Sequence, residues 1–409
     1  MRHRVADVYK AGVLAARLER FGGGTRFSYL PAYLASGGPA VATTLPLGPE
    51  PVLSAAGAAP PYFTGLLPEG RRLNALRRSV KTSVDDELAL LIVAGANPVG
   101  DVQIVGHGEK LDPDEHAVQL DPKLPVDFDA LLGDSGLIDP VALAGVQDKL
   151  SAGMISMPVA RAGRRFILKL NAPEFPHVVE NEFAMFRYAA KLRIPLSRVQ
   201  LIRDVAGRPG LLVERFDRIP VVGGPPDAVL RLAVEDGAQV LGLYPADKYN
   251  VGYGQVCRAL ADYCGAPLPA LRNLAIQAAF AWLSGNGDLH AKNVSMVQQP
   301  LGEWSVAPVY DIPSTVVFGD KTLALTLDGK RNGISRRHFL AWASGLGLTD
   351  RAAVQALALG LKASGPLLAD LEAGTAFASV TDDGGSPFPA MVTREWVKEL
   401  RHRRRLLEG

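Results

Sequence analysis

Gly285-Asn286-Gly287-Asp288-Leu289-His290-Ala291-Lys292-Asn293 is the stretch that decides the fold of this chain. An aspartate, Asp288, stands five residues before an asparagine, Asn293, as in the catalytic loop of protein kinases. In such a loop the aspartate accepts the proton of the substrate hydroxyl, and the asparagine holds a magnesium ion. Taken alone, the spacing also fits a chance turn, because Asp, Asn and Gly are common in turns. The rest of the chain has to decide between these interpretations.

A second carboxylate follows the loop. Asp311 ends the run Pro308-Val309-Tyr310-Asp311, after a short apolar stretch, where a kinase carries its other magnesium ligand. A carboxylate and an amide oxygen can bind magnesium without removing all of its water. The acceptor of the hydroxyl proton has to be a different group. The pattern therefore predicts Asp288 as the catalytic residue and Asn293 with Asp311 as the metal ligands.

Composition limits the function classes. The chain has 409 residues, with 44 Lys and Arg against 42 Asp and Glu, which argues against a free-standing nucleic-acid binder. Its length predicts two or three domains. Cys257 and Cys264 are spaced for one face of a helix, which favours core packing in a reducing cytoplasm. The sequence shows neither a signal peptide nor a membrane span, so we expect a cytoplasmic protein.

The first part of the chain is expected to be rich in strands. Alternating apolar residues with glycine turns predict strands over residues 4–33. Helices are expected at 71–80 and 85–94, and a strand at 102–105. The polar, Pro- and Asp-rich segment 106–135 is interpreted as a linker or excursion.

Lys169 is the most informative residue of the next segment. It lies inside the short apolar strand 166–170, and burying an unpaired ammonium group is costly. It therefore has a carboxylate or phosphate partner, or else belongs to a solvated edge strand. Glu180 or Glu182, on a helix expected at 179–192, could be that partner, and spacing does not choose between them. Gly145, in 141–150, marks either a phosphate-binding glycine loop or a plain hairpin.

Later segments complete the pattern. An antiparallel pair is expected over 199–202 and 210–217, with Glu214 to Phe216 as the connection between lobes, where backbone groups can bind adenine. Beyond residue 230 the sequence predicts helices at 234–242, 254–263, 271–283, 335–346, 350–363, 365–373 and 391–407.

Three cationic features have two interpretations each. His290 has either a functional role, in which it orients Asp288 or approaches a phosphate, or a structural role, in which it braces the loop through a backbone carbonyl. Lys292 either neutralises γ-phosphate charge or is solvated. The arginines of the last helix form either a solvated helix end or a surface for an acidic partner or a DNA phosphate; they are Arg401, Arg403, Arg404 and Arg405.

The order of these features is that of a bilobal kinase: glycine loop, strand lysine, helix glutamate, lobe connection, catalytic loop and second aspartate. We therefore predict an α+β protein with a bilobal protein-kinase-like fold. Its parts would be a β-rich N-terminal subdomain (1–110), a kinase N-lobe (111–220) and a mostly helical C-lobe (221–409).

Several stretches also carry a family resemblance. They are FTGLLPEGRRL (63–73), LAGVQDKLS (143–151), ILKL (167–170), VENEF (179–183), LVERFDR (212–218), EDGAQVLGLYPADKY (235–249), NGDLHAKNVS (286–295) and VYDIPS (309–314). Together they resemble the HipA family of serine/threonine kinase toxins of type II toxin–antitoxin systems.

The resemblance implies an ATP- and Mg²⁺-dependent kinase in which Asp288 is catalytic and Asn293 and Asp311 bind the metal. It implies a nucleotide site lined by Ala144, Gly145, Val146, Gln147, Asp148, Lys149, Lys169, Glu214, Arg215, Phe216, His290, Ala291, Lys292, Asn293, Tyr310 and Asp311. It also implies a HipB-like helix-turn-helix antitoxin, operator DNA bound through that complex, and an aminoacyl-tRNA synthetase as substrate, with growth arrest and persistence as the outcome.

One departure from the family pattern concerns regulation. Family members often have a serine before the glycine loop whose autophosphorylation inactivates the kinase, and Ala142 stands at that position here. Two rival functions stay open. Gly287-Asp288-Leu289-His290 and Asn293 also resemble the loop of aminoglycoside and choline phosphotransferases, and a degenerate kinase fold could serve as a co-repressor without catalysis.

Overall fold

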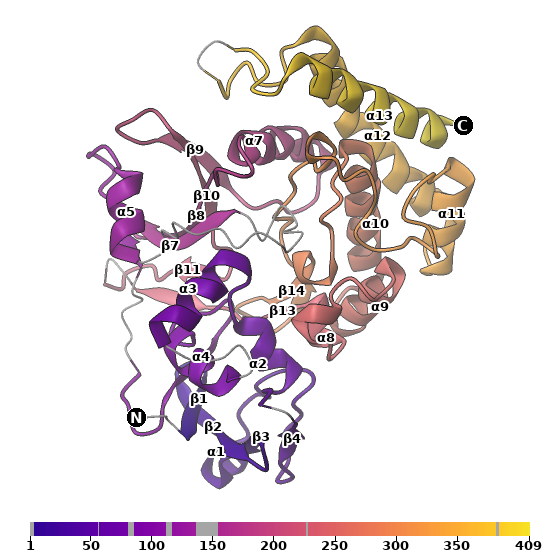
Figure 1. Ribbon diagram of the computed structural model, residues 1–409. Coiled ribbons are helices and arrows are strands. Elements are labelled where there is room, and N and C mark those ends of the chain that lie inside the picture. The colour runs from indigo at the N-terminus through magenta and orange to yellow at the C-terminus, as the bar shows by residue number, and fades with distance from the viewer. Residues whose placement is uncertain are drawn as a thin grey trace.

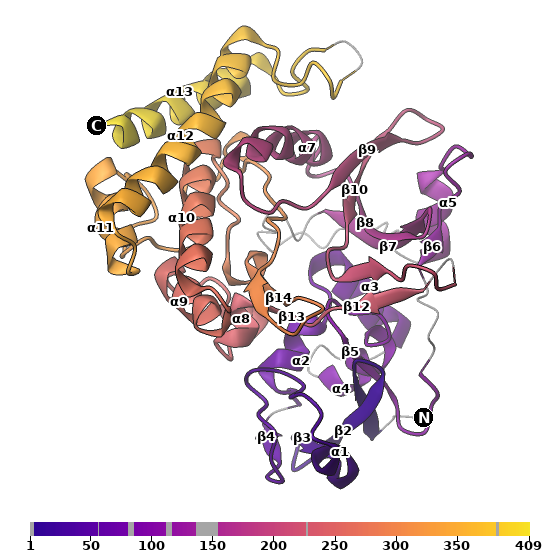
Figure 2. The same cartoon turned by 180° about the vertical axis from the view of Figure 1, so that it is seen from behind.

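The molecule is built from two five-stranded sheets and a group of helices that follow one another along the chain (Figures 1 and 2). The computed structural model describes residues 4–55, 57–80, 86–111, 117–135, 154–225, 228–381 and 384–409. The first sheet belongs to the N-terminal subdomain, the second to the N-lobe, and the helices to the C-lobe. This arrangement confirms the predicted α+β, bilobal kinase-like fold, whereas the exact domain limits stay predictions.

The N-terminal subdomain is a β-rich module, as the sequence predicts. Its antiparallel sheet has the strand order β4-β3-β2-β1-β5 and is made of β1 (Val5–Lys10), β2 (Val13–Phe21), β3 (Gly24–Tyr29), β4 (Val52–Ser54) and β5 (Val102–Gly106). Phe27, Phe63 and Leu91 bury their side chains between the sheet and its helices. Those helices are α1 (Pro31–Ser36), α2 (Pro61–Leu66), α3 (Gly70–Val80) and α4 (Glu87–Ala94).

The N-lobe sheet places Lys169 on an inner strand. Its order is β6-β7-β8-β10-β9, with β6 (Val118–Gln119), β7 (Ile155–Arg161), β8 (Arg164–Leu170), β9 (Val199–Arg203) and β10 (Pro209–Glu214). Because β8 lies between β7 and β10, the solvated edge-strand interpretation of Lys169 is wrong. Helix α7 (Val178–Ala189), followed by the 3₁₀ turn η1 (Ala190–Leu192), matches the helix predicted at 179–192.

The linker interpretation of residues 106–135 is wrong in its second half. Strand β6 pairs in parallel with β7, and helix α5 (Phe128–Ser135) packs its first residue into the core of the N-lobe sheet. A Cβ atom on Gly210 would lie 2.6 Å from the ring of Phe128, so this close contact requires glycine. The segment is polar because most of α5 faces solvent, and its few apolar residues carry the packing.

Helix α10 (Pro267–Ser284) is the central element of the C-lobe. It packs against α9 (Tyr253–Tyr263) and α12 (Asp350–Ala373), where Gly360 faces Ala279 so closely that a Cβ would come within 2.7 Å of it. Trp282 and Trp396 join α10 to the C-terminal helix in one core. The lobe is completed by α11 (Arg336–Gly345), α13 (Ala390–Glu408) and the 3₁₀ turns η2 (Pro245–Asp247) and η4 (Val316–Phe318).

Three of the predicted C-lobe helices have the wrong limits. Residues 234–236 form strand β13 (Val234–Asp236), which pairs with β14 (Ser295–Gln298) next to β15 (Trp304–Val306), so only α8 (Gly237–Val240) remains helical. The helices predicted at 350–363 and 365–373 are one helix, α12, that continues through Pro366. A short hairpin of β11 (Arg218–Pro220) and β12 (Val229–Arg231) lies beside the N-lobe.

Several lesser predictions can be settled. Cys257 and Cys264 are both buried in the C-lobe core, as expected. The arginines of α13 mostly have partners: Arg401 pairs with Glu372, and Arg403 is buried against the ring of Trp282. Helix α12 is long and apolar enough to span a membrane by composition alone, but one such helix is weak evidence, and its buried residues belong to this core.

Candidate active site

The predicted catalytic loop begins where α10 ends. Gly285 caps the helix with a φ of 80°, a left-handed conformation that favours glycine. Gly287 is needed for space, because a Cβ there would lie 2.5 Å from the hydroxyl oxygen of Thr315. The backbone N–H of Gly287 donates to the same hydroxyl, and the Asn293 amide donates to the carbonyl of Asp288 at 2.8 Å. These bonds hold the two ends of the loop, which closes in the 3₁₀ turn η3 (Ala291–Asn293).

Asp288 is buried, with 2% of its surface exposed. The hydroxyl of Tyr249 lies beside its carboxylate, and burial followed by the negative charge of Asp288 raises the pKa of Tyr249. The His290 Nε2 atom lies 3.8 Å from the Asp288 carboxylate, too far for a hydrogen bond, and the ring of His290 packs edge-on against Tyr249. Tyr249 therefore places a polar group beside the buried Asp288 carboxylate.

Lys169 lies between two carboxylates. Its ammonium nitrogen is 2.8 Å from Glu182 and 2.9 Å from Asp311, which answers the choice between the two helix glutamates. Glu180 instead accepts hydrogen bonds from Asn171 and His177. Burial opposes the charge of Lys169, but the two carboxylates raise its pKa above the usual value. The ion pair of Lys169 with Asp311 thereby joins the N-lobe to the C-lobe.

Asp311 adopts a φ of 55°, an uncommon conformation for a residue other than glycine. Only one of its carboxylate oxygens contacts Lys169, and in the described part of the chain the other accepts no hydrogen bond. The side-chain oxygen of Asn293 likewise accepts none from the residues that the structure describes. Both residues thus keep an oxygen available, as the prediction of metal ligands requires.

Lys292 is not solvated. Its ammonium group donates to the backbone carbonyl of Gly65 at 2.8 Å and to the carboxylate of Asp236 at 2.9 Å. The Tyr310 hydroxyl donates to the carbonyl oxygen of Lys292 and shares a 2.6 Å hydrogen bond with Ser295, and burial raises the pKa of Tyr310. Lys292 therefore ties the catalytic loop to the N-terminal subdomain.

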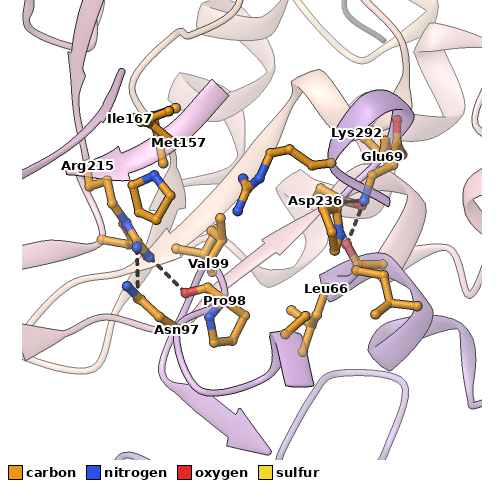
Figure 3. A pocket seen from close by; sticks show the side chains of 18 of the residues that line it. Leu66, Glu69, Asn97, Pro98, Val99, Met157, Ile167, Arg215, Asp236 and Lys292 are labelled. Carbon is orange, nitrogen blue, oxygen red and sulfur yellow. Dashed lines mark hydrogen bonds and ion pairs between the residues drawn. The ribbon is translucent and has the colours of Figure 1, made fainter. Parts of the chain in front are cut away.

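A cavity of about 760 Å³ lies where all three parts of the molecule meet. Figure 3 shows Arg215, Met157 and Ile167 on one side of it, Lys292, Asp236 and Glu69 on the other, and Val99 between them. The predicted nucleotide residues in its lining are Lys169, Glu214, Arg215, Phe216, His290, Lys292, Asn293, Tyr310 and Asp311.

Some predicted site residues do not line this cavity. Asp288 and Ala291 are buried behind the lining. Ala144, Gly145, Val146, Gln147, Asp148 and Lys149 lie outside the described residues, as does Ala142. Arg215 lines the cavity, but its guanidinium group is bound to Asp217, Asn97 and the carbonyl of Pro98. Arg215 and Arg218 hold the pKa of Asp217 well below its usual range in spite of burial.

The contribution of the N-terminal subdomain to the cavity was not predicted. Glu69 and Arg72 belong to the stretch FTGLLPEGRRL, which the family resemblance marked without giving these residues a role. The same holds for Tyr249 of the C-lobe, which lies beside Asp288 and ends the stretch EDGAQVLGLYPADKY. Val99 lines the cavity from the loop before β5. Their position depends on contacts between residues far apart in the chain, which spacing cannot reveal.

The fold and the cleft define a bilobal, kinase-like protein. Comparison with known families makes this more specific: residues 6–105 match the HipA N-terminal domain, and residues 141–363 match the HipA-like C-terminal domain. The chain belongs to the HipA family.

Individual relatives agree with this assignment. The putative kinase Y4dM of Sinorhizobium fredii is 32% identical over 65% of this chain and 65% of its own length. The serine/threonine-protein kinase toxin HipA of Shewanella oneidensis is 29% identical over 70% of this chain and 71% of its own length.

A solved structure shows the same fold. It is a chain from the complex of HipA, HipB and operator DNA of the Shewanella oneidensis MR-1 toxin–antitoxin system. It superposes with a TM-score of 0.77 at 21% identity and covers 98% of this chain and 97% of its own length.

Proposed function

We propose that this chain is an ATP-dependent serine/threonine protein kinase and the toxin of a HipA/HipB-like toxin–antitoxin module. One observation carries the proposal. Lys169 joins a helix carboxylate to Asp311 at a cavity that also contains Asn293, next to the buried Asp288. A strand lysine, a helix glutamate and a second aspartate in contact are the groups that protein kinases use to hold a nucleotide.

The residues present fit magnesium and ATP. Asn293 and Asp311 each keep an oxygen available for a metal, and Lys169 has the charge to contact phosphate oxygens. The glycine-loop residues 144–149 would approach the phosphates through backbone N–H groups. When bound, magnesium-ATP would supply the phosphoryl group, and its metal would offset the negative charge of the phosphates.

Asp288 would accept the proton of the substrate hydroxyl. The Tyr249 hydroxyl would donate to the Asp288 carboxylate, and the Asn293 amide holds the backbone of the same residue. Glu214 to Phe216 would contact the adenine, with Met157, Ile167 and Val99 supplying apolar surface around it. Because Asp288 lies behind the cavity lining, the side chains in front of it would have to rearrange to admit a substrate hydroxyl.

Antitoxin, DNA and substrate are proposed from the relatives. A Shewanella relative is named as a serine/threonine-protein kinase toxin, and the solved chain comes from a complex with HipB and operator DNA. By this analogy the chain would bind a HipB-like antitoxin, reach operator DNA through it, and phosphorylate an aminoacyl-tRNA synthetase in the cytoplasm.

The test is a labelling experiment. The purified chain is incubated with γ-labelled ATP, magnesium and a cell lysate, beside an Asp288→Asn variant of equal thermal stability. Label on a protein band with the wild type, and its absence with the variant, would support the proposal. Label only in small molecules would favour a small-molecule phosphotransferase. Growth arrest by the Asp288→Asn variant in cells would favour a non-catalytic co-repressor.

A further inference from the structure

Helix α3 of the N-terminal subdomain lies against the N-lobe sheet, and residues at its start contact both kinase lobes. Glu69, directly before the helix, pairs with Lys248 of the C-lobe. Arg71, in its first turn, pairs with Glu174 of the N-lobe. In Figures 1 and 2, α3 lies between the N-lobe sheet and the rest of its own subdomain. The helix therefore forms one wall of the cavity and is attached on both sides of it.

Arg72 directly follows these two attachments in the first turn of α3, and it lines the cavity. The other lysines and arginines of the lining have acidic partners: Lys169 pairs with Glu182 and Asp311, Arg215 with Asp217, and Lys292 with Asp236. In contrast, Arg72 forms neither a hydrogen bond nor an ion pair with any residue that the structure describes.

An unpaired guanidinium in this position is costly. Arg72 is only partly exposed, and burial, followed by the positive charge of Arg215, lowers its pKa. Both effects disfavour the charged form, so Arg72 is stabilised most by an anion that enters the cavity. A guanidinium group presents several donors in one plane, which suits the oxygens of a phosphate.

We propose that Arg72 binds the phosphate chain of the nucleotide. This inference rests on the proposed function, because it needs a nucleotide in the cleft. The N-terminal subdomain then supplies a direct ligand to the site, in addition to the contacts that attach it to the lobes.

Calorimetric titration of the full chain tests the inference. The probes are a non-hydrolysable ATP analogue with magnesium, which carries the phosphates, and adenosine, which lacks them. We expect Arg72→Ala to weaken binding of the analogue at least tenfold and to leave adenosine binding unchanged. Arg72→Lys keeps the charge without the planar geometry and should lie between the alanine variant and the wild type.

Arg71→Ala is the matched control, because it removes the same charge from the neighbouring position, whose guanidinium contacts Glu174 instead of the cavity. It should bind both probes as the wild type does, and thermal melting verifies that each variant is folded. Equal losses for adenosine and the analogue in Arg72→Ala would assign Arg72 to the base and overturn the inference, as would no loss at all.

The proposed function is tested separately in the same experiment. If Asp311→Asn weakens the magnesium-bound analogue but Arg72→Ala does not, only the role of Arg72 is wrong. If the wild type binds neither the analogue nor adenosine, the proposed kinase activity itself is wrong.

Discussion

Two partly buried lysines line the same cavity but join different parts of the molecule. Lys169 of the N-lobe contacts Glu182 and Asp311, and we call these three residues the lobe cluster. Each member of the lobe cluster corresponds to a group with a role in the proposed chemistry: a phosphate contact, its positioning carboxylate and a metal ligand.

Lys292 of the C-lobe contacts Asp236 and the carbonyl of Gly65, and we call these three residues the subdomain cluster. Asp236 caps helix α8, and Gly65 belongs to helix α2 of the N-terminal subdomain. A partly buried lysine needs an acceptor in both clusters, yet only in the lobe cluster do the acceptors also have a proposed role in phosphoryl transfer. Burial with a partner therefore does not distinguish a catalytic lysine from one that holds an interface.

The largest effect is expected in the lobe cluster and in the catalytic loop. Asp311→Ala removes a proposed metal ligand, and Asp288→Ala removes the proposed proton acceptor. We expect each to reduce phosphoryl transfer by about 10³-fold or more, the magnitude typical of groups that stabilise the transition state. Steady-state labelling measures the rate, and thermal melting serves as the control for folding. Retained turnover in either variant would contradict the assignment.

The subdomain cluster should affect stability. Lys292→Met leaves the Asp236 carboxylate buried without its cation, so the free energy of unfolding should fall by about 3 kcal/mol. Adding Asp236→Asn removes the orphaned charge but keeps an acceptor for the α8 cap, so most of the stability should return. Chemical denaturation followed by circular dichroism measures both variants.

The exposed pair of Lys321 and Glu395 provides a control, since Lys321→Met should change the unfolding free energy by less than about 1 kcal/mol. The corresponding double change in the lobe cluster, Lys169→Met with Glu182→Gln, should recover stability but not phosphoryl transfer. Recovery of transfer in that variant would remove the distinction between the two clusters.

The interface beside the subdomain cluster should depend on pH. Glu235, next to Asp236 in β13, accepts hydrogen bonds from the backbone and the hydroxyl of Thr43, and burial raises its pKa to about 6 from a usual value of 4.5. The folded state therefore holds this proton more tightly than the unfolded state does. Its contribution is fully present below the unfolded pKa and is lost as the pH rises from about 4.5 to about 6.

The raised pKa corresponds to a loss of up to about 2 kcal/mol across this pH window. In Glu235→Gln this titration is absent, so the difference in unfolding free energy between wild type and variant should change in the variant's favour over the window. Urea denaturation at several pH values measures the difference, in which the titration of all other groups cancels. A pH-independent difference would show that burial does not perturb Glu235.

The two clusters also explain how much the sequence could predict. The strand lysine, the catalytic loop and the second aspartate follow from local patterns, and the order of the motifs predicts the bilobal fold. The partner of Lys292 could not be predicted, because Asp236 was assigned to a helix. Strand β13 has three residues, and its conformation is decided by pairing with β14, far away in the sequence.

The same limit applies to Arg72 and Tyr249. Each lies in a motif that resembles the family, but its role follows from a packing contact between parts of the chain that no local spacing connects. Arg72 lines the cavity because α3 is held between Lys248 and Glu174. Local patterns therefore predict the groups on the loops and strands of the cleft better than those that the N-terminal subdomain brings to it.

The smallest effect is expected at Tyr249, which lies between a contact of the N-terminal subdomain and the catalytic loop. It follows Lys248, the partner of Glu69 in the N-terminal subdomain, and its hydroxyl lies beside Asp288 in the catalytic loop, to which we expect it to donate. Tyr249→Phe removes that hydroxyl but keeps the ring against His290, so we expect phosphoryl transfer to fall by about tenfold, the value of one hydrogen bond to a charged group. The Michaelis constant for ATP should not change.

Tyr253→Phe is the matched control, because the Tyr253 hydroxyl donates to the carbonyl of Leu274 inside the C-lobe core. It should lower stability slightly and leave transfer unchanged. If Tyr249→Phe altered the Michaelis constant for ATP as strongly as the turnover number, Tyr249 would act on the nucleotide cleft as a whole. Tyr249 would then belong with the contacts that attach the N-terminal subdomain to the lobes. The distinction between residues that act in phosphoryl transfer and residues that only hold the structure would not apply to Tyr249.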